Sequence, residues 1–370
     1  MIAQTVAITG SNGFIGRNLL VRLTEIGFNV APIGRDSNEQ QWKSALSSAD
    51  AIIHLAGANR PANDAEFLEI NLGVTQRMAA MLLDLGRAIP VIYASTAKAD
   101  EPTEYGYSKR LAEEHLQKLA NTLGNQLYIY RLPNVFGKWA RPNYNSAVAT
   151  FCHNIARDIP IKIHDPAMPL TLVYVDDVIA EFIATLDQQP KAGFRDVQPT
   201  YITTVGEVAN MIRGFRNDRT ENLIANVGTG LARALYASYV SALPTEQFSY
   251  QIASHTDPRG SFSEMLKTKE AGQFSYFTAD PGVTRGGHYH HTKTEKFLIV
   301  NGHARFRFRN ILTDETHEVT TSADCPVIVE TIPGWSHDVT NVGDDLLVSL
   351  LWANEIFDRE KPDTISMKVF

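Results

Sequence analysis

The first two thirds of the chain alternate short apolar runs with longer stretches whose apolar residues recur at helical spacing. The runs are residues 6–10, 29–33, 51–57, 91–94 and 127–130. Helical spacing lies between them, for example over 62–85 and 105–123. Because a parallel strand is buried on both faces and its crossover is right-handed, this order predicts an α/β fold with a doubly wound parallel sheet.

The pattern changes near Pro244. Residues 182–239 keep helical spacing, and we expect them to complete a small substrate subdomain. Beyond Pro244, short alternating runs such as 296–300 and 304–309 are separated by turn residues and predict a small antiparallel barrel or jelly roll. A chain of 370 residues is long for one hydrophobic core. We therefore predict two domains, residues 1–245 and 246–370.

Composition and charge exclude several classes of protein. The net charge of −7, without a basic stripe, argues against nucleic acid as a partner. No apolar run approaches the roughly 20 residues that span a bilayer, so no membrane insertion is expected. The first residues lack a basic region and cleavage signal and indicate a strand, which predicts a cytoplasmic protein. Cys152 and Cys325 are expected to be buried free thiols, as suits a reducing compartment.

A glycine turn follows the first run. Gly10, Gly13 and Gly16 lie between a predicted strand and a predicted helix, where glycines let the backbone approach the pyrophosphate of a dinucleotide. Arg35 follows the second run and suits the 2′-phosphate of NADP, although Asp36 beside it leaves NAD as the alternative. The third run ends at 55–57 and would border the cofactor. His54 in this run is interpreted as a packed strand histidine.

A possible catalytic group surrounds the helix predicted from residue 105. Tyr105 and Lys109 are four residues apart and share one helical face, where the lysine ammonium would lower the pKa of the phenol. Ser95 and Thr96 end the fourth run at the ligand-binding edge of the sheet. A hydroxyl there could fix a carbonyl while a cofactor brings hydride and Tyr105 brings the proton.

These motifs together resemble extended short-chain dehydrogenases, many of which modify nucleotide sugars. The glycine turn, 54–57, Ser95-Thr96, Tyr105 with Lys109, 131–137 and 173–178 occur in that family's order. The resemblance implies that Thr96 is the catalytic hydroxyl and that Pro133 lies near the nicotinamide. Only residues 97–104 separate Thr96 from Tyr105, so the loop over the substrate is expected to be trimmed. The predicted NADPH contacts are Gly10, Asn12, Gly13, Phe14, Ile15, Gly16, Arg35, Leu55, Ala56, Gly57, Tyr105, Lys109 and Pro133.

Two loops are predicted to contact a nucleotide sugar. The first contains Pro61 after two polar residues, and the second runs from 136 to 145 with cationic and aromatic side chains that could meet a diphosphate, base or sugar. A solvated loop with packed aromatics is the alternative. Asp176 and Asp177 are expected to cap a helix. The predicted substrate residues are Asn59, Arg60, Asn134, Lys138, Arg141 and Asn145.

A metal-binding pattern lies in the second domain. His288 and His290 are two apart and would project to one face of a strand, and Glu295 and the distant His337 could complete a His3Glu site. Zinc is the first expectation, with manganese, iron, cobalt or nickel as alternatives. The first part of this pattern resembles the cupin family, whereas Pro333 is displaced by one position from the usual second motif.

Residues 257–264 and 285–288 also resemble cupin-type keto-sugar epimerases, more loosely, because those enzymes generally use a His–Asp base without metal. The epimerase base is not identified by the sequence: Tyr289, His291 and a metal-bound water remain open.

The whole chain resembles the CapF-type bifunctional UDP-sugar epimerase–reductases of capsule and O-antigen synthesis. The resemblance implies C3 epimerisation of UDP-2-acetamido-2,6-dideoxy-4-keto-L-hexose in the cupin domain. Reduction at C4 with NADPH would then give UDP-2-acetamido-2,6-dideoxy-L-talose, a precursor of UDP-N-acetyl-L-fucosamine. A homodimer is expected because cupin domains commonly pair. One alternative is a reductase whose cupin only stabilises a dimer through its metal. The other is a non-enzymatic NADPH sensor.

Overall fold

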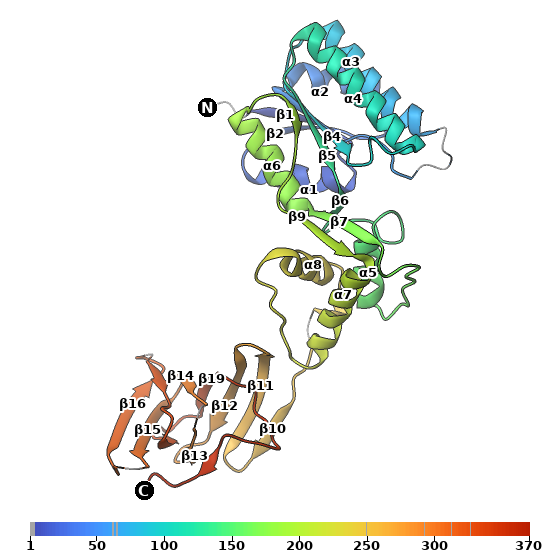
Figure 1. Cartoon of the computed structure of the whole chain (residues 1–370). Coiled ribbons are helices and arrows are strands. Elements are labelled where there is room, and N and C mark those ends of the chain that lie inside the picture. Colours follow the sequence, from blue (N-terminus) through green and yellow to red (C-terminus); the bar gives the residue numbers. More distant parts are fainter. Residues whose placement is uncertain are drawn as a thin grey trace. The chain divides into compact units, whose positions relative to one another are not determined.

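The chain forms two compact units (Figure 1). The computed structural model describes residues 4–60, 63, 66–248, 250–291, 293–311, 313–325 and 327–370, so Pro61 and the start of the predicted 62–85 helix lie outside it. The first unit runs through Arg213 and includes Thr229–Pro244, and the second joins Gly214–Gly228 to Thr245–Phe370. Gly214–Gly228 joins the second unit partly through the Ile224 amide, which donates to the Lys267 carbonyl. The division into domains 1–245 and 246–370 stays a prediction.

A six-stranded parallel sheet forms the centre of the first unit. Its spatial order is β2-β1-β3-β4-β5-β8, with every neighbouring pair parallel. The strands are β1 (Thr5–Thr9), β2 (Asn29–Ile33), β3 (Ala51–His54), β4 (Val91–Thr96), β5 (Leu127–Leu132) and β8 (Gly193–Arg195). The apolar runs of β1, β3, β4 and β5 are buried in the interior of this sheet, as predicted, whereas β2 lies at its edge and only Ile33 of that strand is buried. Their carboxyl ends lie at one edge, where such sheets bind ligands.

Helices cover both faces of this sheet (Figure 1). On one face α2 (Glu39–Ser48), α3 (Val74–Leu85) and α4 (Glu104–Leu123) bury their apolar stripes against alternate strand residues such as Ile52 and Tyr93. On the other face lie α1 (Phe14–Glu25) and α6 (Val175–Gln188). Leu68–Gly73 forms a π-helical turn, η1, before α3. The alternation of strands and helices is the predicted doubly wound arrangement.

A smaller layer completes the first unit. It contains the three-stranded sheet β6 (Asn134–Phe136), β7 (Pro169–Tyr174) and β9 (Thr200–Thr204), and the helices α5 (Ala147–Ala156) and α8 (Gly230–Ser241). The helix α7 (Val205–Thr220) follows β9. The helical expectation for 182–239 is wrong at β8 and β9. Residues 200–204 are mostly β-branched, and pairing with β7 overrides their apparent helical spacing.

The second unit is a pair of antiparallel sheets. The first sheet has the order β10-β11-β12-β19-β14-β17 and the second β16-β15-β18-β13-β20. A short 3-10 helix, η2 (Thr245–Gln247), precedes them. The strands are β10 (Ser254–Asp257), β11 (Gly260–Thr268), β12 (Gly272–Ala279), β13 (Thr284–Tyr289), β14 (Glu295–Asn301), β15 (His303–Asn310), β16 (Thr316–Ser322), β17 (Ile328–Glu330), β18 (Trp335–Asn341), β19 (Leu347–Ala353) and β20 (Ile365–Ser366).

Strict alternation of inward and outward residues creates the core of this barrel. On β15, Phe306 and Phe308 point inward and join a cluster with Phe297 and Val339. The alternating arginines, Arg305, Arg307 and Arg309, face outward. Arg307 donates to both carboxylate oxygens of Asp338, at 3.0 and 2.7 Å. Arginines that alternate with buried phenylalanines and pair with carboxylates are typical of the outer face of a half-buried strand rather than of a nucleic-acid patch.

The two cysteines differ in environment. Both are free, but only Cys152 is buried, whereas Cys325 is exposed. The expectation of two buried thiols is therefore wrong for Cys325, which follows a turn after β16. Among the described residues, no helix is both long and apolar enough to cross a membrane.

Candidate active site and metal centre

The glycine turn is shaped by close backbone contacts. Gly10 has a φ of +70°, and a Cβ on it would lie 2.8 Å from the Ala56 amide nitrogen. A Cβ on Gly16 would lie 2.3 Å from the Gly10 carbonyl oxygen. Only glycine fits these two positions. In the described structure no side chain caps the N-terminus of α1 at Gly13, and its first turn contains no acidic residue. Its N–H groups and dipole therefore form a site suited to a phosphate.

The second predicted strand ends beside this turn, because the Gly10 amide donates to the Ile33 carbonyl at 2.8 Å. The side chain of Asn12 lies beside Gly34, so close that a Cβ on that glycine would lie 2.8 Å from its Nδ2 atom. Arg35 follows in the exposed turn after β2, next to the equally exposed Asp36. Pro133 lies half-buried between β5 and β6. The arrangement therefore presents an arginine where the sequence predicts recognition of a 2′-phosphate.

His54 organises the backbone after β3. Its Nδ1 is hydrogen-bonded to the Thr9 hydroxyl at 2.6 Å and its Nε2 to the Thr75 hydroxyl at 2.9 Å. The Thr9 hydroxyl in turn accepts from the amides of Leu55 and Ala56, both at 3.1 Å. Burial lowers the pKa of His54 to about 3, so the ring is neutral. The interpretation of His54 as a packed histidine is confirmed.

Tyr105 lies in the first turn of α4, beside the end of β4. Its hydroxyl is hydrogen-bonded to Thr96, whereas the neighbouring Ser95 donates to the buried carboxylate of Glu113. Successive strand residues point to opposite faces, which explains the different partners of Ser95 and Thr96. Thr96 is therefore the hydroxyl that the fold places beside the phenol. Burial raises the pKa of Tyr105, and the hydrogen bond with Thr96 opposes part of that rise.

Lys109 lies one turn after Tyr105 and is almost fully buried. Its ammonium donates to the Ala94 carbonyl at 2.7 Å and lies 4.5 Å from the ring centroid of Tyr93. Burial lowers the pKa of Lys109 to about 8, which Glu113 partly opposes. The sequence predicted that Lys109 would lower the pKa of Tyr105. In this structure the pKa of Tyr105 is raised instead, because the loss of solvent outweighs the favourable interactions.

Two supporting residues were missed by the sequence analysis. Asn71 in η1 accepts from the Ala58 amide at 2.8 Å and donates to the Ser108 hydroxyl at 2.9 Å. A Cβ on Gly57 would lie only 2.7 Å from the Asn71 side-chain oxygen. Asn71 thus ties the turn after β3 to the helix that carries Tyr105. A π-helical turn has no clear sequence signature, so nothing in the sequence alone marked this residue.

Glu113 is the second missed residue. Its carboxylate accepts from Ser95 and from two nitrogens of Arg131, at 3.1 and 2.7 Å. Arg131 also pairs with Asp100 at 2.6 Å. The network joins α4, β4 and β5 directly behind Lys109. A signal was present, because Glu113 is four residues after Lys109 and shares its helical face.

The two predicted substrate loops are brought together across 84 residues of sequence. Arg60 donates to the Tyr144 carbonyl, and the Tyr144 hydroxyl donates to the Arg60 carbonyl at 3.1 Å. The Arg141 guanidinium lies 5.0 Å from the centroid of the Tyr144 ring. The loops therefore form one exposed cationic surface, with Asn59 and Asn145 exposed on the same two segments.

Lys138 and Asn134 interact with other residues of the first unit instead. Lys138 pairs with Asp176 at 2.5 Å, and Asn134 donates to the Thr171 carbonyl at 3.0 Å. Asp176 and Asp177 lie in the first turn of α6, as expected, but neither caps the helix: the N-cap position is Tyr174, which makes no side-chain hydrogen bond there. Asp176 instead neutralises Lys138, so a phosphate would have to compete with this carboxylate.

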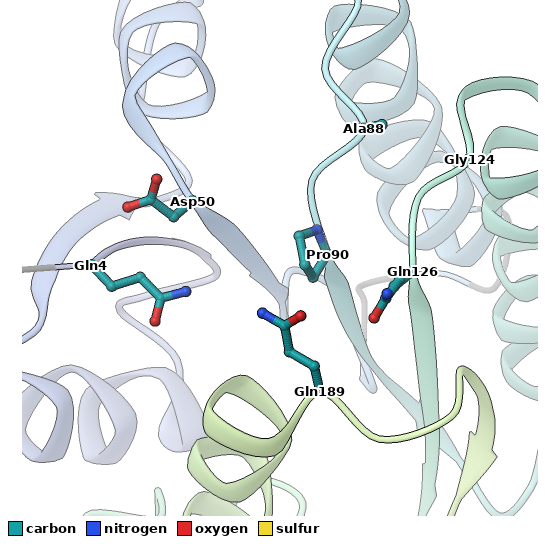
Figure 2. A pocket seen from close by; sticks show the side chains of 7 residues that line it. All are labelled: Gln4, Asp50, Ala88, Pro90, Gly124, Gln126 and Gln189. Carbon is teal, nitrogen blue, oxygen red and sulfur yellow. The ribbon is translucent and has the colours of Figure 1, made fainter.

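A hollow of about 720 Å³ lies elsewhere on the first unit (Figure 2). It is lined by Gln4, Asp50, Ala88, Pro90, Gly124, Gln126 and Gln189. These residues precede β1, β3, β4 and β5 or follow α6, so the hollow lies at the amino ends of the strands. It is at the opposite edge from Tyr105 and takes no part in the candidate active site.

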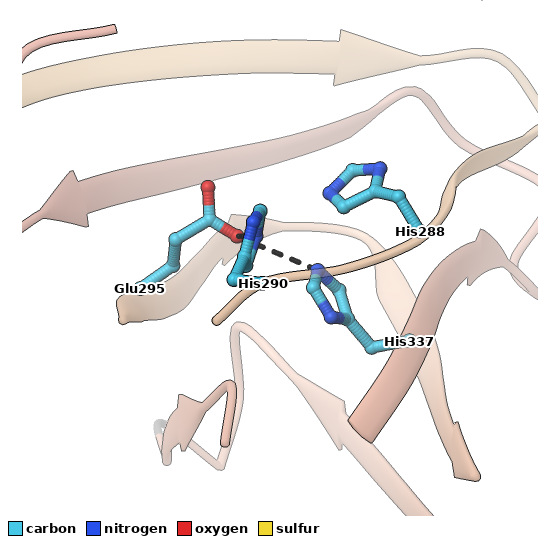
Figure 3. A group of neighbouring side chains, drawn as sticks. All are labelled: His288, His290, Glu295 and His337. Carbon is cyan, nitrogen blue, oxygen red and sulfur yellow. Dashed lines mark hydrogen bonds and ion pairs between the residues drawn. The ribbon is translucent and has the colours of Figure 1, made fainter. Parts of the chain in front are cut away.

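Three histidines and a glutamate converge inside the barrel (Figure 3). One ligand atom from each of His288, His290, Glu295 and His337 lies within 4.8 Å of the others. The two histidines of β13 and its extension face inward because they are two apart, and β18 supplies His337 from the neighbouring strand. Although Pro333 departs from the expected motif, His337 takes the predicted position.

The donor set fits a divalent cation. Burial lowers the pKa of His288 to about 4, aided by His337, which leaves the imidazole in its neutral ligand form. Burial alone would raise the pKa of Glu295, but hydrogen bonds with His290 and His337 overcome it and the pKa is lowered. His290 lies between two acceptors, the Asp363 carbonyl at 2.5 Å and Glu295 at 3.2 Å. The Nε2 atom of His290 and the carboxylate of Glu295 would thus both be donors to a cation held by this group.

The fold and these two sites define a dehydrogenase domain joined to a cupin-type barrel. Residues 6–197 match the NAD dependent epimerase/dehydratase family, and residues 255–365 match the polysaccharide biosynthesis C-terminal domain. The first match covers more than half of the chain, and the chain belongs to the NAD dependent epimerase/dehydratase family.

Full-length relatives are more specific. The chain is 54% identical over 366 residues to a UDP-2-acetamido-2,6-β-L-arabino-hexul-4-ose reductase of Pseudomonas aeruginosa, covering 98% of each. It also matches the crystal structure of the capsular polysaccharide assembling protein CapF of Staphylococcus aureus, with a TM-score of 0.93 and 38% identity over 98% of this chain and 100% of that one. The predicted fold class and the resemblance to CapF-type enzymes are confirmed.

Proposed function

We propose that the protein epimerises a UDP-linked 4-keto-6-deoxy amino sugar at C3 in the barrel and reduces it at C4 with NADPH in the first unit. The observation that carries this proposal is the presence, in one chain, of a Tyr105–Thr96–Lys109 group beside an open phosphate site and a buried His3Glu group. The reductase name of the P. aeruginosa relative supports the same substrate class. The proposed substrate is UDP-2-acetamido-2,6-dideoxy-4-keto-L-hexose, and the product is UDP-2-acetamido-2,6-dideoxy-L-talose.

In the reduction, Thr96 and Tyr105 would hold the C4 oxygen of the sugar. When bound, NADPH supplies the hydride that adds to C4. Tyr105 gives its proton to the oxygen, so that the ketone becomes an alcohol. The raised pKa of Tyr105 keeps this proton in place at neutral pH. The ammonium of Lys109 would favour the phenolate that remains, and Arg35 would select the 2′-phosphate.

In the epimerisation, the barrel residues would act on a C–H bond made acidic by the C4 ketone. His288, His290, Glu295 and His337 would hold one divalent cation, for which zinc is the first expectation. When bound, that cation supplies positive charge that stabilises an enolate oxygen. The proton leaves C3 and a proton returns to the other face of the ring. The sugar's oxidation state does not change, so this step needs no redox partner. Tyr289 and His291 alternate with the inward histidines along β13 and its extension, and His291 is exposed, which argues against either as the base.

The test is an NMR assay in D2O with the UDP-4-keto-6-deoxy-L-HexNAc substrate and without NADPH. Deuterium should enter at C3 with wild-type protein and should not enter with folded His290→Ala protein. NADPH added afterwards should give the talo product. If NADPH is consumed but no deuterium enters the sugar, the protein is a 4-keto-sugar reductase.

That outcome would favour the second candidate, in which the barrel is a metal-stabilised dimerisation module. The buried ligand group alone fits this function as well, because a structural metal also prefers a closed set of four ligands. Light scattering with and without a chelator would then report whether the metal supports a homodimer. The homodimer and the cytoplasmic location stay predictions in either case.

A further inference from the structure

The last eight residues of the chain, 363–370, lie along the strand that carries the candidate metal ligands. We call this segment the C-terminal strap. Its short strand β20 pairs with β13, placing Ser366 opposite His288 and Ile365 opposite Tyr289. The Met367 amide donates to the Gly287 carbonyl at 2.9 Å, and the Ser336 hydroxyl donates to the Met367 carbonyl at 2.5 Å.

The end of the strap is also held. Val369 is buried, and its carbonyl accepts from Arg309 at 3.5 Å. The Arg307 guanidinium lies 5.2 Å from the centroid of the Phe370 ring. The strap therefore contacts β13, β15 and β18, and β13 and β18 are the strands that bring His288 and His337 together.

Asp363 makes the most direct connection to the ligand group. Its carbonyl is hydrogen-bonded to the Nδ1 atom of His290 at 2.5 Å. Because a carbonyl can only accept, this contact puts a proton on Nδ1 and leaves Nε2 to face Glu295 and the centre of the ligand group. The ring of His290 is 1% exposed, so water does not offer an alternative partner.

The Asp363 side chain holds this carbonyl in place. One carboxylate oxygen accepts from the His291 amide at 2.9 Å, and the other accepts from the Lys293 amide at 2.8 Å. The next residue, Thr364, accepts from the Lys293 ammonium at 3.1 Å. Asp363 thus fixes the backbone on the C-terminal side of His290 while its own carbonyl orients the ring.

We propose that Asp363 is a positioning residue of the metal centre and that the C-terminal strap is required for tight metal binding. The proposal rests on the proposed function to the extent that the His3Glu group binds a divalent cation. An outer partner that fixes the ring orientation of a histidine ligand typically contributes about 10- to 100-fold to metal affinity. Without the Asp363 partner, the ring of His290 would be free to rotate, and fixing it on metal binding would reduce the binding free energy.

The experiment measures zinc affinity of full-length variants by equilibrium competition with a chromogenic chelator. Asp363→Ala should weaken zinc binding by about 10- to 100-fold. Asp363→Asn keeps one acceptor oxygen and should fall between the wild type and Asp363→Ala. Asp358→Ala is the matched control, since Asp358 accepts from the amides of Glu360 and Lys361 in the same tail without touching the ligand group. The control should stay within about twofold of the wild type.

Thermal melts with and without zinc separate positioning from simple loss of stability. If Asp363 positions His290, the rise in Tm produced by zinc should shrink in Asp363→Ala and be smallest in a chain ending at Pro362. If the strap is only structural, both melting temperatures should fall together and the zinc-induced rise should match the wild type, which would overturn the proposal. Wild-type protein that binds no zinc or other divalent cation would overturn the metal centre itself, a failure visible without any variant.

Discussion

The two candidate sites are built in opposite ways. In the barrel, four side chains from neighbouring strands already face one another, and their ligand atoms lie within 4.8 Å. In the first unit, the candidate cofactor site is mainly backbone, made by the glycine turn and the N-terminus of α1, and the candidate catalytic side chains come from β4 and α4. A metal site needs only one small ion, whereas hydride transfer must align two large molecules.

The environment of the key ionisable groups differs correspondingly. In the barrel, hydrogen bonds with His290 and His337 lower the pKa of Glu295 despite its burial. In the first unit, burial dominates, so the pKa of Tyr105 is raised and that of Lys109 is lowered. Burial thus favours the neutral form wherever no strong partner compensates. The ionised carboxylate of Glu295 suits a cation in the barrel, and the protonated phenol of Tyr105 suits a proton donor in the first unit.

The largest expected effect comes from removing that proton donor. Tyr105→Phe should lower kcat for NADPH oxidation with the keto sugar by about 10²- to 10⁴-fold, because general acid catalysis is lost while binding surfaces remain. Deuterium exchange at C3 in the barrel should be unchanged. Tyr107→Phe, on the same helix and partly exposed, is the control. Equal loss of both activities in Tyr105→Phe would show that the two sites are not independent.

A smaller effect is expected from the network behind Lys109. Glu113→Gln should lower the free energy of unfolding of the first unit by about 2–3 kcal/mol. This is less than the usual loss for a broken buried ion pair, because Arg131 is partly exposed and still pairs with Asp100. Urea unfolding, monitored with a separate signal for each unit, would measure this change in the free energy of unfolding. Zinc affinity of the barrel should not change. Glu114→Gln, an exposed neighbour, should shift stability by less than about 0.5 kcal/mol.

The mildest test is the pH dependence of reduction. Lys109 has a pKa of about 8, so its ammonium is present below that pH and lost above it. The kcat/KM for reduction should fall above pH 8, approaching about tenfold per pH unit. Over this range Tyr105 stays protonated, because its pKa is raised. Lys109→Arg should move this fall to higher pH, because a guanidinium stays charged. A fall at the same pH in Lys109→Arg would assign it to another group.

Unfolding would not explain that loss. The folded pKa of Lys109 lies below the unfolded value of about 10.4, so between these values the folded protein binds fewer protons than the unfolded chain. The contribution of Lys109 to stability therefore increases with pH over this window. A decrease in activity there reports the chemistry of the site.

Much of the architecture could be predicted from local patterns. The glycine turn, the strands and the spacing of Tyr105 and Lys109 follow from hydrophobic periodicity and backbone sterics, which act over a few residues. The same holds for His288 and His290, whose separation of two residues places both inside the barrel. The strand β9 was missed because its pairing with β7, about 30 residues earlier, decides its conformation.

The supporting contacts required the tertiary structure. Arg60 meets Tyr144 across 84 residues, Arg131 meets Glu113 across 18, and Asp363 reaches His290 across 73. No local pattern marks such pairs, since each exists only after loop closure has brought distant strands together. The direction of the pKa shift of Tyr105 was predicted wrongly because the burial of its phenol is a property of the folded protein. The sequence determined which groups neighbour each other on a helix or strand, whereas burial and long-range partners, which set their charge and orientation, were decided by the fold.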